Sequence, residues 1–149
     1  MVFIPFRVLI NRTYQDKHTW CCKAIIFNAL FTGTVNRWNE GHVSKSITFR
    51  RHQGALVIGR SGTYYVYSQM YYEDCSQHSM SHYTFLNERK ILGSQSSINH
   101  CNARYFTNYQ GGVFHLNVGD QLTVRVLRSR KFFMIAEFSY FGLFMLYPD

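Results

Sequence analysis

The stretch Gly62-Thr-Tyr-Tyr-Val-Tyr-Ser-Gln-Met-Tyr-Tyr72 decides how the rest of the chain is interpreted. Its aromatic and β-branched residues favour a strand, and the glycine at its start marks a turn. Successive side chains of a strand point to opposite faces, so a strand with one solvated face alternates between apolar and polar residues. Here both alternating sets are apolar: one contains Tyr64, Val66, Met70 and Tyr72, and the other contains Tyr65, Tyr67 and Tyr71. The sequence therefore predicts a strand that is covered on both sides.

The cover for the second side is not visible in the sequence. No segment has the periodicity of an amphipathic helix, so helices are not expected to cover the sheet. Residues 138–146 form a second strand candidate that is apolar on both faces. If the two strands are neighbours, three exposed rings of about 150–250 Å² each approach the largest apolar patch that a monomer leaves in water. We therefore expect another copy of the chain to cover this side.

The remaining sequence is a series of short strand candidates at roughly 8–12-residue spacing, separated by turn residues. The strand candidates are residues 6–10, 46–50, 55–58, 81–86, 90–96, 111–116 and 121–127. Residues 13–33, 74–80, 99–108 and 128–137 are predicted to be loops, the first with some structure of its own. This pattern predicts an all-β fold, an antiparallel sandwich or jelly roll of two sheets.

Composition indicates one folded domain, residues 1–149. The chain is 46% hydrophobic and 16% charged, which is typical of a folded protein. The formal net charge of +8 favours an acidic partner but does not choose among a protein, a nucleic acid and an anionic surface. The basic residues form only small groups such as Arg50-Arg51 and Arg89-Lys90, so no nucleic-acid partner is expected.

Neither a membrane-spanning segment nor a signal peptide is visible. No apolar run reaches about 18 residues, and the first residues lack a basic region followed by a long apolar one. Asn11-Arg12-Thr13 is a glycosylation acceptor, and four cysteines are compatible with an oxidising compartment. If the protein is secreted or tethered to a membrane, the tether is expected to lie outside this chain.

Three blocks, in order and spacing, resemble the tumour necrosis factor ligand family. They are the stretch from Gly62, then Gly111-Gly-Val-Phe-His-Leu-Asn-Val-Gly-Asp-Gln-Leu, and then Tyr140-Phe-Gly-Leu-Phe-Met-Leu. Leu56-Val-Ile and Trp38-Asn-Glu also look like the family's pattern. The resemblance covers residues 35–146, whereas residues 1–34 are a divergent N-terminal strand and long loop.

The resemblance implies an extracellular cytokine, either secreted or the ectodomain of a type II membrane protein. Such a ligand forms a threefold-symmetric homotrimer and binds cysteine-rich receptors in the grooves between subunits, with immune or apoptotic signalling as the outcome and without a cofactor. The tyrosines that match Tyr67, Tyr109 and Tyr140 line the threefold axis in that family. With the neighbours that share their faces, the predicted trimer interface is Tyr65, Tyr67, Gln69, Tyr109, Tyr140 and Phe144. The opposite faces, with Tyr64, Val66, Met70, Phe141, Leu143 and Met145, would form the core. The alternative is that the tyrosines fill an ordinary core.

The resemblance also implies a disulfide between Cys75 and Cys101, which lie in the two loops that many members join. One branch of the family instead keeps a single cysteine near the position of Cys101 and uses three copies to hold zinc, but the presence of Cys75 favours the disulfide. Cys75, His78 and His82 also suggest a metal site, yet this segment does not look helical and no metal is predicted. Cys21 and Cys22 have no assigned role.

Receptor contacts are expected in two places. Family members use the loop between the fourth and fifth strands, often with an apolar tip. Here this loop is short and Asn87 stands at the tip, so Phe85 or Leu86 is the candidate replacement. The second place is the basic loop before the last strand, which would suit an acidic receptor, although a merely solvated loop is an equal alternative. The candidate residues are Phe85, Leu86, Asn87, Glu88, Arg89, Arg128, Arg130 and Lys131.

No enzyme is predicted. Gly-x-Ser-x-Gly, His-Glu-x-x-His and a glycine-rich phosphate loop are missing from the sequence, and its histidines are dispersed. Two alternatives to a cytokine stay open. One is a complement-type globular head, a trimeric recognition module suggested by the closing Leu146-Tyr-Pro-Asp. The other is a structural jelly roll such as a capsid or lectin-like shell protein.

Overall fold

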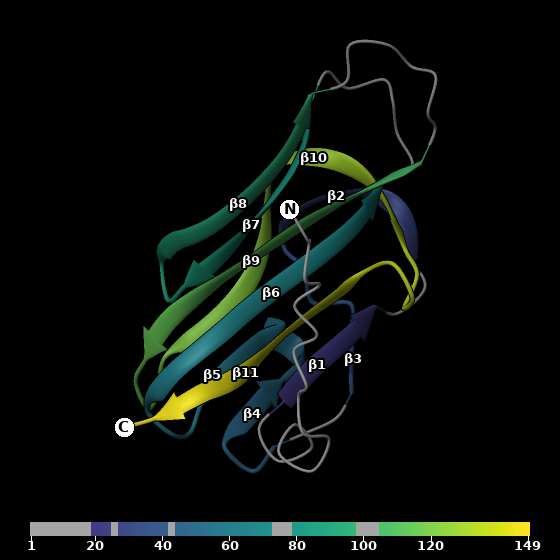
Figure 1. The fold of residues 1–149 in the computed structure, drawn as a ribbon. Helices are drawn as coiled ribbons and strands as arrows, with labels where there is room; N and C mark the ends of the chain where they lie inside the picture. Colours follow the sequence, from purple (N-terminus) through teal and green to yellow (C-terminus); the bar gives the residue numbers. More distant parts are fainter. Residues whose placement is uncertain (1–18, 25–26, 42–43, 73–78, 98–104) are drawn as a thin grey trace, which may run out of the picture.

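The computed structural model describes residues 19–24, 27–41, 44–72, 79–97 and 105–149 (Figure 1). These residues form eleven β-strands and one short 3-10 helix. The strands are β1 (Thr19–Ala24), β2 (Phe27–Thr34), β3 (Trp38–Glu40), β4 (Ile47–Arg50), β5 (Ala55–Ile58), β6 (Gly62–Tyr72), β7 (Ser79–Leu86), β8 (Arg89–Ser97), β9 (Phe106–Leu116), β10 (Gln121–Met134) and β11 (Tyr140–Pro148). The helix η1 (Arg51–Gln53) links β4 to β5.

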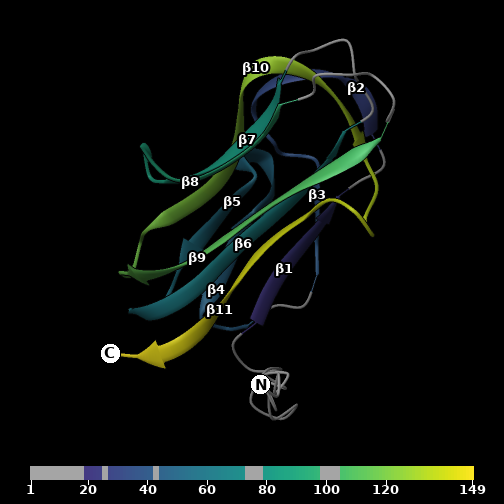
Figure 2. The ribbon, with the colours of Figure 1, turned by 45° about the horizontal axis from the view of Figure 1, so that its top comes forward.

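The strands form two antiparallel layers. The inner sheet has the order β3-β1-β11-β6-β9. The outer sheet is built on β10, which pairs with β5 and β2 along one edge and with β7 along the other, and it continues to β4 and β8. β10 also bends over to the inner sheet, where Phe132 pairs with Tyr72. Figures 1 and 2 show β9, β6 and β11 side by side in one layer, and Figure 1 shows β6 and β11 in front of β5. The predicted all-β fold of two sheets, a jelly roll, is confirmed.

β6 lies at the centre of the inner sheet. It pairs with β11 on one side and β9 on the other, so the two strands with no solvated face are neighbours, as predicted. Burial alternates strictly along β6. Tyr64, Val66 and Met70 are fully buried, whereas Tyr65 and Tyr67 are only partly covered. One face of β6 therefore belongs to the core and the other faces away from it.

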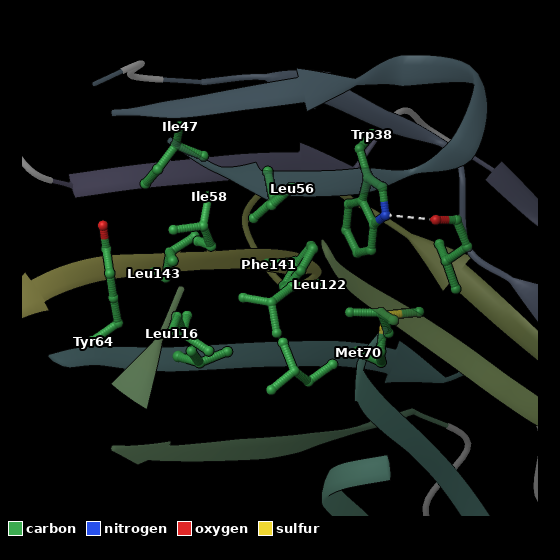
Figure 3. Close-up of a cluster of buried hydrophobic side chains, with 14 of the residues drawn as sticks. Trp38, Ile47, Leu56, Ile58, Tyr64, Met70, Leu116, Leu122, Phe141 and Leu143 are labelled. Atoms are coloured by element: carbon green, nitrogen blue, oxygen red, sulfur yellow. Dashed lines mark hydrogen bonds between the residues drawn. The ribbon is translucent and has the colours of Figure 1, made fainter. Parts of the chain in front are cut away.

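The core fills the space between the two sheets (Figure 3). The inner sheet contributes the predicted residues Tyr64, Val66, Met70, Phe141, Leu143 and Met145, all of which are buried. Facing them are Leu56 and Ile58 from β5 and Leu122 from β10. Trp38 closes one end, packed on Phe141 with ring centroids 6.1 Å apart, and its indole N–H donates to the carbonyl of Val35 at 2.8 Å. The indole is thus buried with its polar atom satisfied.

Polar side chains interrupt the core between β6, β7 and β9. The ring of His82 lies between Ser68 and Tyr72, with 3.1 Å from Nε2 to Ser68 Oγ and 3.1 Å from Nδ1 to the Tyr72 hydroxyl. Gln110 Nε2 donates to Ser68 Oγ at 2.8 Å and to Thr84 Oγ1 at 3.0 Å. His82 is fully buried, and this burial lowers its pKa to about 3. The imidazole is therefore held neutral at physiological pH.

Several predicted loops are strands. Residues 13–33 contain β1 and β2, which pair with β11 and β3 and with β10 respectively. β9 begins at Phe106 and β10 continues to Met134, and Ser79 and Met80 belong to β7. These strands lack a clear apolar alternation of their own and are defined by hydrogen bonds to distant partners. The strand predicted at residues 6–10 lies outside the described residues.

Among the residues that the structure describes, no helix combines the length and the apolar character needed to cross a bilayer.

Candidate interaction surfaces

The outward side of the inner sheet gathers the predicted interface residues. Antiparallel pairing places Tyr140 opposite Gln69, Phe144 opposite Tyr65, and Gln69 opposite Tyr109. Because opposite residues of paired strands share a face, these side chains form one surface. We call it the aromatic face; its residues are Tyr65, Tyr67, Gln69, Tyr109, Tyr140 and Phe144. The structure thus brings together the six residues that the sequence singled out.

The rings of the aromatic face pack against one another. The Tyr65 ring centroid lies 5.4 Å from that of Phe144 and 6.3 Å from that of Tyr67. The Tyr67 ring lies 6.1 Å from Tyr140 and 6.5 Å from Phe144. These separations are in the range of favourable aromatic pairs, so each ring helps to fix its neighbours. Tyr67 contacts three of the others and is the centre of the cluster.

Hydroxyl groups and one amide complete the aromatic face. The hydroxyls of Tyr65 and Tyr109 are 3.0 Å apart, and the Tyr140 hydroxyl donates to Gln69 Oε1 at 3.2 Å. Gln69 Nε2 in turn donates to the carbonyl of Phe138 at 3.0 Å. Partial burial and the hydrogen bond with Tyr65 raise the pKa of Tyr109 well above its usual range. The Tyr109 hydroxyl is therefore uncharged at neutral pH.

Much of the aromatic face is open in the single chain. Tyr109 is 49% exposed, and Val113, which lies opposite Tyr65 on the same face of β9, is 57% exposed. Tyr65, Tyr67 and Tyr140 are partly covered, whereas their neighbours on the opposite parity are buried. The alternative that these tyrosines fill the core of the sandwich is therefore wrong.

A second ring cluster continues the same row of β6 and was not predicted from the sequence. Tyr71 stacks on Tyr105 at 5.8 Å and contacts Phe138 at 5.0 Å. Tyr105 and Phe138 are 44% and 45% exposed. Tyr105 lies in the predicted loop 99–108, and Phe138 lies at the first position of the strand candidate 138–146, so the contact of Tyr105 with Tyr71 could not be predicted from the sequence.

The β7–β8 hairpin is fastened to the β9–β10 turn. Asn87 has a left-handed backbone, with φ of 54°. Its Nδ2 donates to Asp120 Oδ1 at 3.1 Å, and its Oδ1 accepts from the backbone N–H of Gln121 at 3.0 Å. Asparagine is among the few residues that adopt this backbone region readily. Asn87 therefore holds the hairpin in place, although the sequence suggested a receptor contact.

We expect Asn87→Ala to lower the free energy of unfolding more than Asn87→Gly does. Both variants lose the side-chain hydrogen bonds, but only alanine is strained at a φ of 54°. Each lost hydrogen bond is worth about 1 kcal/mol, and the left-handed alanine costs about 1 kcal/mol more. Urea unfolding of the two variants and the parent measures the difference. Equal stability of the two variants would contradict the backbone argument.

The other hairpin candidates differ in how much surface they offer. Phe85 is 9% exposed and Leu86 is 8% exposed, so the expectation of an exposed apolar tip at either residue does not agree with the structure. Arg125 lies 4.4 Å over the Phe85 ring and pairs with Glu88, at 2.9 Å from Nη1 to Oε2. Arg125 lowers the pKa of Glu88. Arg89 is exposed.

The basic loop before the last strand is not a loop in its first half. Arg128, Arg130 and Lys131 lie on β10, and the last two pair with Phe31 and Leu30 of β2. Sheet pairing thus overrides the local basic composition. Arg128 is exposed, so it stays available to a partner.

Several predicted sites lie outside the described residues. These are the glycosylation acceptor at Asn11 and the cysteines Cys75 and Cys101, which stay predictions. Cys21 and Cys22 lie on β1, opposite Gly142 and Phe141. Within the described ranges no three His, Cys, Asp or Glu side chains gather as metal ligands. The metal reading of His82 is wrong, because both of its ring nitrogens have partners in the buried polar cluster.

Comparison with known proteins identifies the family. The profile of the TNF (Tumour Necrosis Factor) family matches residues 36–146. The chain belongs to the TNF family. The aromatic face, the β7–β8 hairpin and the core except Val35 lie within the matched residues.

Curated TNF family ligands are similar to this chain in sequence. Tumor necrosis factor ligand superfamily member 6 of Rattus norvegicus is 29% identical over an alignment of 120 residues that covers 73% of this chain and 43% of that protein. Member 10 of Mus musculus is 31% identical over an alignment of 139 residues, gaps included, that covers 75% of this chain and 47% of that protein. The chain therefore spans less than half the length of these relatives.

Solved TNF family structures share the fold. Eiger TNF from S. frugiperda superposes with a TM-score of 0.76 at 20% identity, covering 89% of this chain and 94% of that one. Murine APRIL, in a crystal structure at pH 5.0, gives a TM-score of 0.70 at 18% identity, covering 87% and 98%. Both comparisons support the jelly roll.

Proposed function

We propose that this chain is the receptor-binding domain of a TNF-like cytokine, which assembles as a homotrimer through the aromatic face. The observation that carries the proposal is the aromatic face itself. Six uncharged residues from three neighbouring strands form one surface, yet Tyr109 within it is half exposed in the single chain. Surfaces of this kind mark sites of protein association.

A threefold arrangement would cover the face economically. Tyrosine and phenylalanine bury about 150–250 Å² each, so five rings per chain in three chains would place a large apolar area in one contact. At about 25 cal/mol per Å² such burial offsets the entropy lost on association. If each chain contacts the next and the three contacts close into a ring, the aromatic face of every chain is covered.

The proposed partner is a cysteine-rich, TNF-receptor-like protein that binds in the grooves between subunits. Arg89 on the hairpin and Arg128 on β10 are the exposed candidate contacts. With a net charge of +8, the protein would meet an acidic receptor surface more rapidly. The proposed activity arises from clustering receptors and involves no catalysis and no cofactor.

An extracellular location is part of the proposal, with the chain either secreted or tethered through a segment outside it. The proposed Cys75–Cys101 disulfide and glycosylation at Asn11 belong to such a compartment. The family match favours a cytokine over a complement-type head or a capsid or lectin-like shell protein.

The proposal is tested by mass and by receptor binding. We expect light scattering after gel filtration to give the mass of three chains of 17.6 kDa each. We also expect the protein to bind at least one ectodomain in a panel of cysteine-rich TNF receptors, with up to three receptors per trimer. A monodisperse monomer would contradict the assembly, and a trimer that binds none of the panel would contradict the receptor assignment.

A further inference from the structure

Gly111 on β9 lies beneath the ring of Tyr65. In the β6–β9 pairing it is opposite Tyr67, at the centre of the aromatic face. A Cβ atom at this position would overlap with the Tyr65 hydroxyl oxygen and would lie 2.8 Å from Cζ of the same ring. It would also lie 2.9 Å from the hydroxyl oxygen of Tyr109. Any side chain at position 111 would therefore overlap with both tyrosines.

The backbone conformation at position 111 does not require a glycine. Gly33, Gly54 and Gly119 have positive φ values, a region that favours glycine, but Gly111 is not among the glycines with positive φ. An alanine at 111 would fit the strand backbone. The requirement at this position is thus one of space above the sheet.

The space above Gly111 determines where Tyr65 lies. The Tyr65 ring extends diagonally across β9, so that its hydroxyl reaches that of Tyr109 at 3.0 Å. Its other neighbours are Phe144 and Tyr67, which leave the ring little room to move along β6. Displacing Tyr65 would therefore disturb the contacts of three other rings of the aromatic face.

We propose that Gly111 is a positioning residue for self-association. Its missing side chain forms a slot that holds Tyr65 flat across β9 and gives the aromatic face the shape that a second copy of the chain can cover. This assignment rests on the proposed function, because it concerns the same surface. Gly111 acts on self-association by positioning Tyr65 and Tyr109, and not by a contact of its own with the second copy.

Gly111→Ala tests the assignment, with Gly93→Ala as its matched control. A Cβ at Gly93 would lie 2.9 Å from Cδ1 of Tyr83, a comparable overlap with a tyrosine ring on β7 of the outer sheet. We expect Gly111→Ala to raise the concentration at which half of the trimer dissociates by about tenfold or more. The reason is that the Tyr65 ring of each of the three chains is forced out of its preferred rotamer. Gly93→Ala should leave that concentration within about twofold of the parent, and far-UV circular dichroism should show both variants folded.

A double-mutant cycle separates the slot from a general effect on the strand. Tyr65→Leu removes the two atoms nearest to a Cβ at 111, the hydroxyl oxygen and Cζ of Tyr65, so Gly111→Ala should add much less dissociation in the Tyr65→Leu background than in the parent. An equal cost in both backgrounds would overturn the assignment. So would a persisting nuclear Overhauser contact between the Tyr65 and Tyr109 rings in Gly111→Ala.

The outcomes distinguish this inference from the proposed function. A parent chain that is monomeric overturns the proposed trimer, and the role of Gly111 in assembly with it. A trimeric parent whose Gly111→Ala variant dissociates like Gly93→Ala overturns the role of Gly111 and leaves the trimer intact.

Discussion

Tyr67→Asp is expected to convert the assembled protein into single chains. Tyr67 is the centre of the aromatic face, with its ring 6.1 Å from Tyr140 and 6.5 Å from Phe144. A carboxylate at this position would be transferred from water into an apolar contact without a cation to pair with, at a cost of several kcal/mol per ion. A threefold contact contains the charge three times, at mutually repelling positions. Because about 1.4 kcal/mol corresponds to a tenfold change in affinity, the trimer should disappear at any practical concentration.

Light scattering of the parent and the variant measures the mass of each and so distinguishes a trimer from single chains. Tyr67→Phe retains the ring and should stay trimeric. Tyr83→Asp is the matched control, since Tyr83 is also partly covered but lies in the outer sheet, where Lys90 contacts its ring at 3.9 Å. We expect Tyr83→Asp to keep the mass of three chains. A trimeric Tyr67→Asp would exclude the aromatic face as the assembly surface.

The sequence predicts which residues of β6 lie on each face of the sheet, because the alternation of side chains along a strand is a local property. The assignment of Tyr64, Val66 and Met70 to the core follows from their parity, and burial confirms it. The same parity places Tyr65 and Tyr67 on the opposite side of the sheet. Substitutions on the two faces should therefore have different consequences: loss of stability on the core face and loss of assembly on the aromatic face.

What the sequence does not predict depends on pairing between distant segments. β1 and β2 have weak patterns of their own, and they are strands because β11 and β10 offer free edges. The basic segment that contains Arg128 is a strand for the same reason. Hydrogen bonding to a neighbouring strand is available to almost any residue, so composition alone cannot reveal it.

In the candidate site, too, local patterns were predictable from the sequence and contacts between distant residues were not. The six residues of the aromatic face were predictable from parity together with the family resemblance. The slot at Gly111 was not, because it depends on a diagonal contact with Tyr65 across two strands. The burial of Phe85 and Leu86 was also unexpected, since it follows from how the hairpin packs on β10.

A buried histidine makes the fold sensitive to acid. His82 has a pKa of about 3 in the folded chain, because burial opposes its charged form, against about 6.5 in an unfolded chain. The groups that bond to its ring, Ser68 and Tyr72, are neutral, as are Thr84 and Gln110 next to Ser68. None of them offers a negative charge to a protonated ring. Below pH 6.5 the unfolded chain thus binds a proton that the folded chain excludes.

The sign of the effect follows from this difference. The stability that depends on neutral His82 is complete above pH 6.5 and is lost as the pH falls from 6.5 towards 3. At about 1.4 kcal/mol per pH unit, the free energy of unfolding should be lower by about 2 kcal/mol at pH 5 than at pH 7. Urea unfolding at the two pH values measures this difference. Both measurements are made at one protein concentration, because the proposed assembly would also stabilise the chain.

Substitution of the histidine isolates its contribution to the acid sensitivity. His82→Gln keeps hydrogen-bonding atoms but cannot be protonated near neutral pH, so it should be less stable than the parent at pH 7 and lose about 2 kcal/mol less between pH 7 and pH 5. His115→Gln is the control, because His115 is half exposed and pairs with Asp149 at the surface. At pH 7 its free energy of unfolding should stay within about 1 kcal/mol of the parent, because an exposed ion pair contributes little to stability. An acid dependence that survives in His82→Gln would place the responsible group elsewhere, and the neutral polar cluster between β6, β7 and β9 would then have no part in the response to pH.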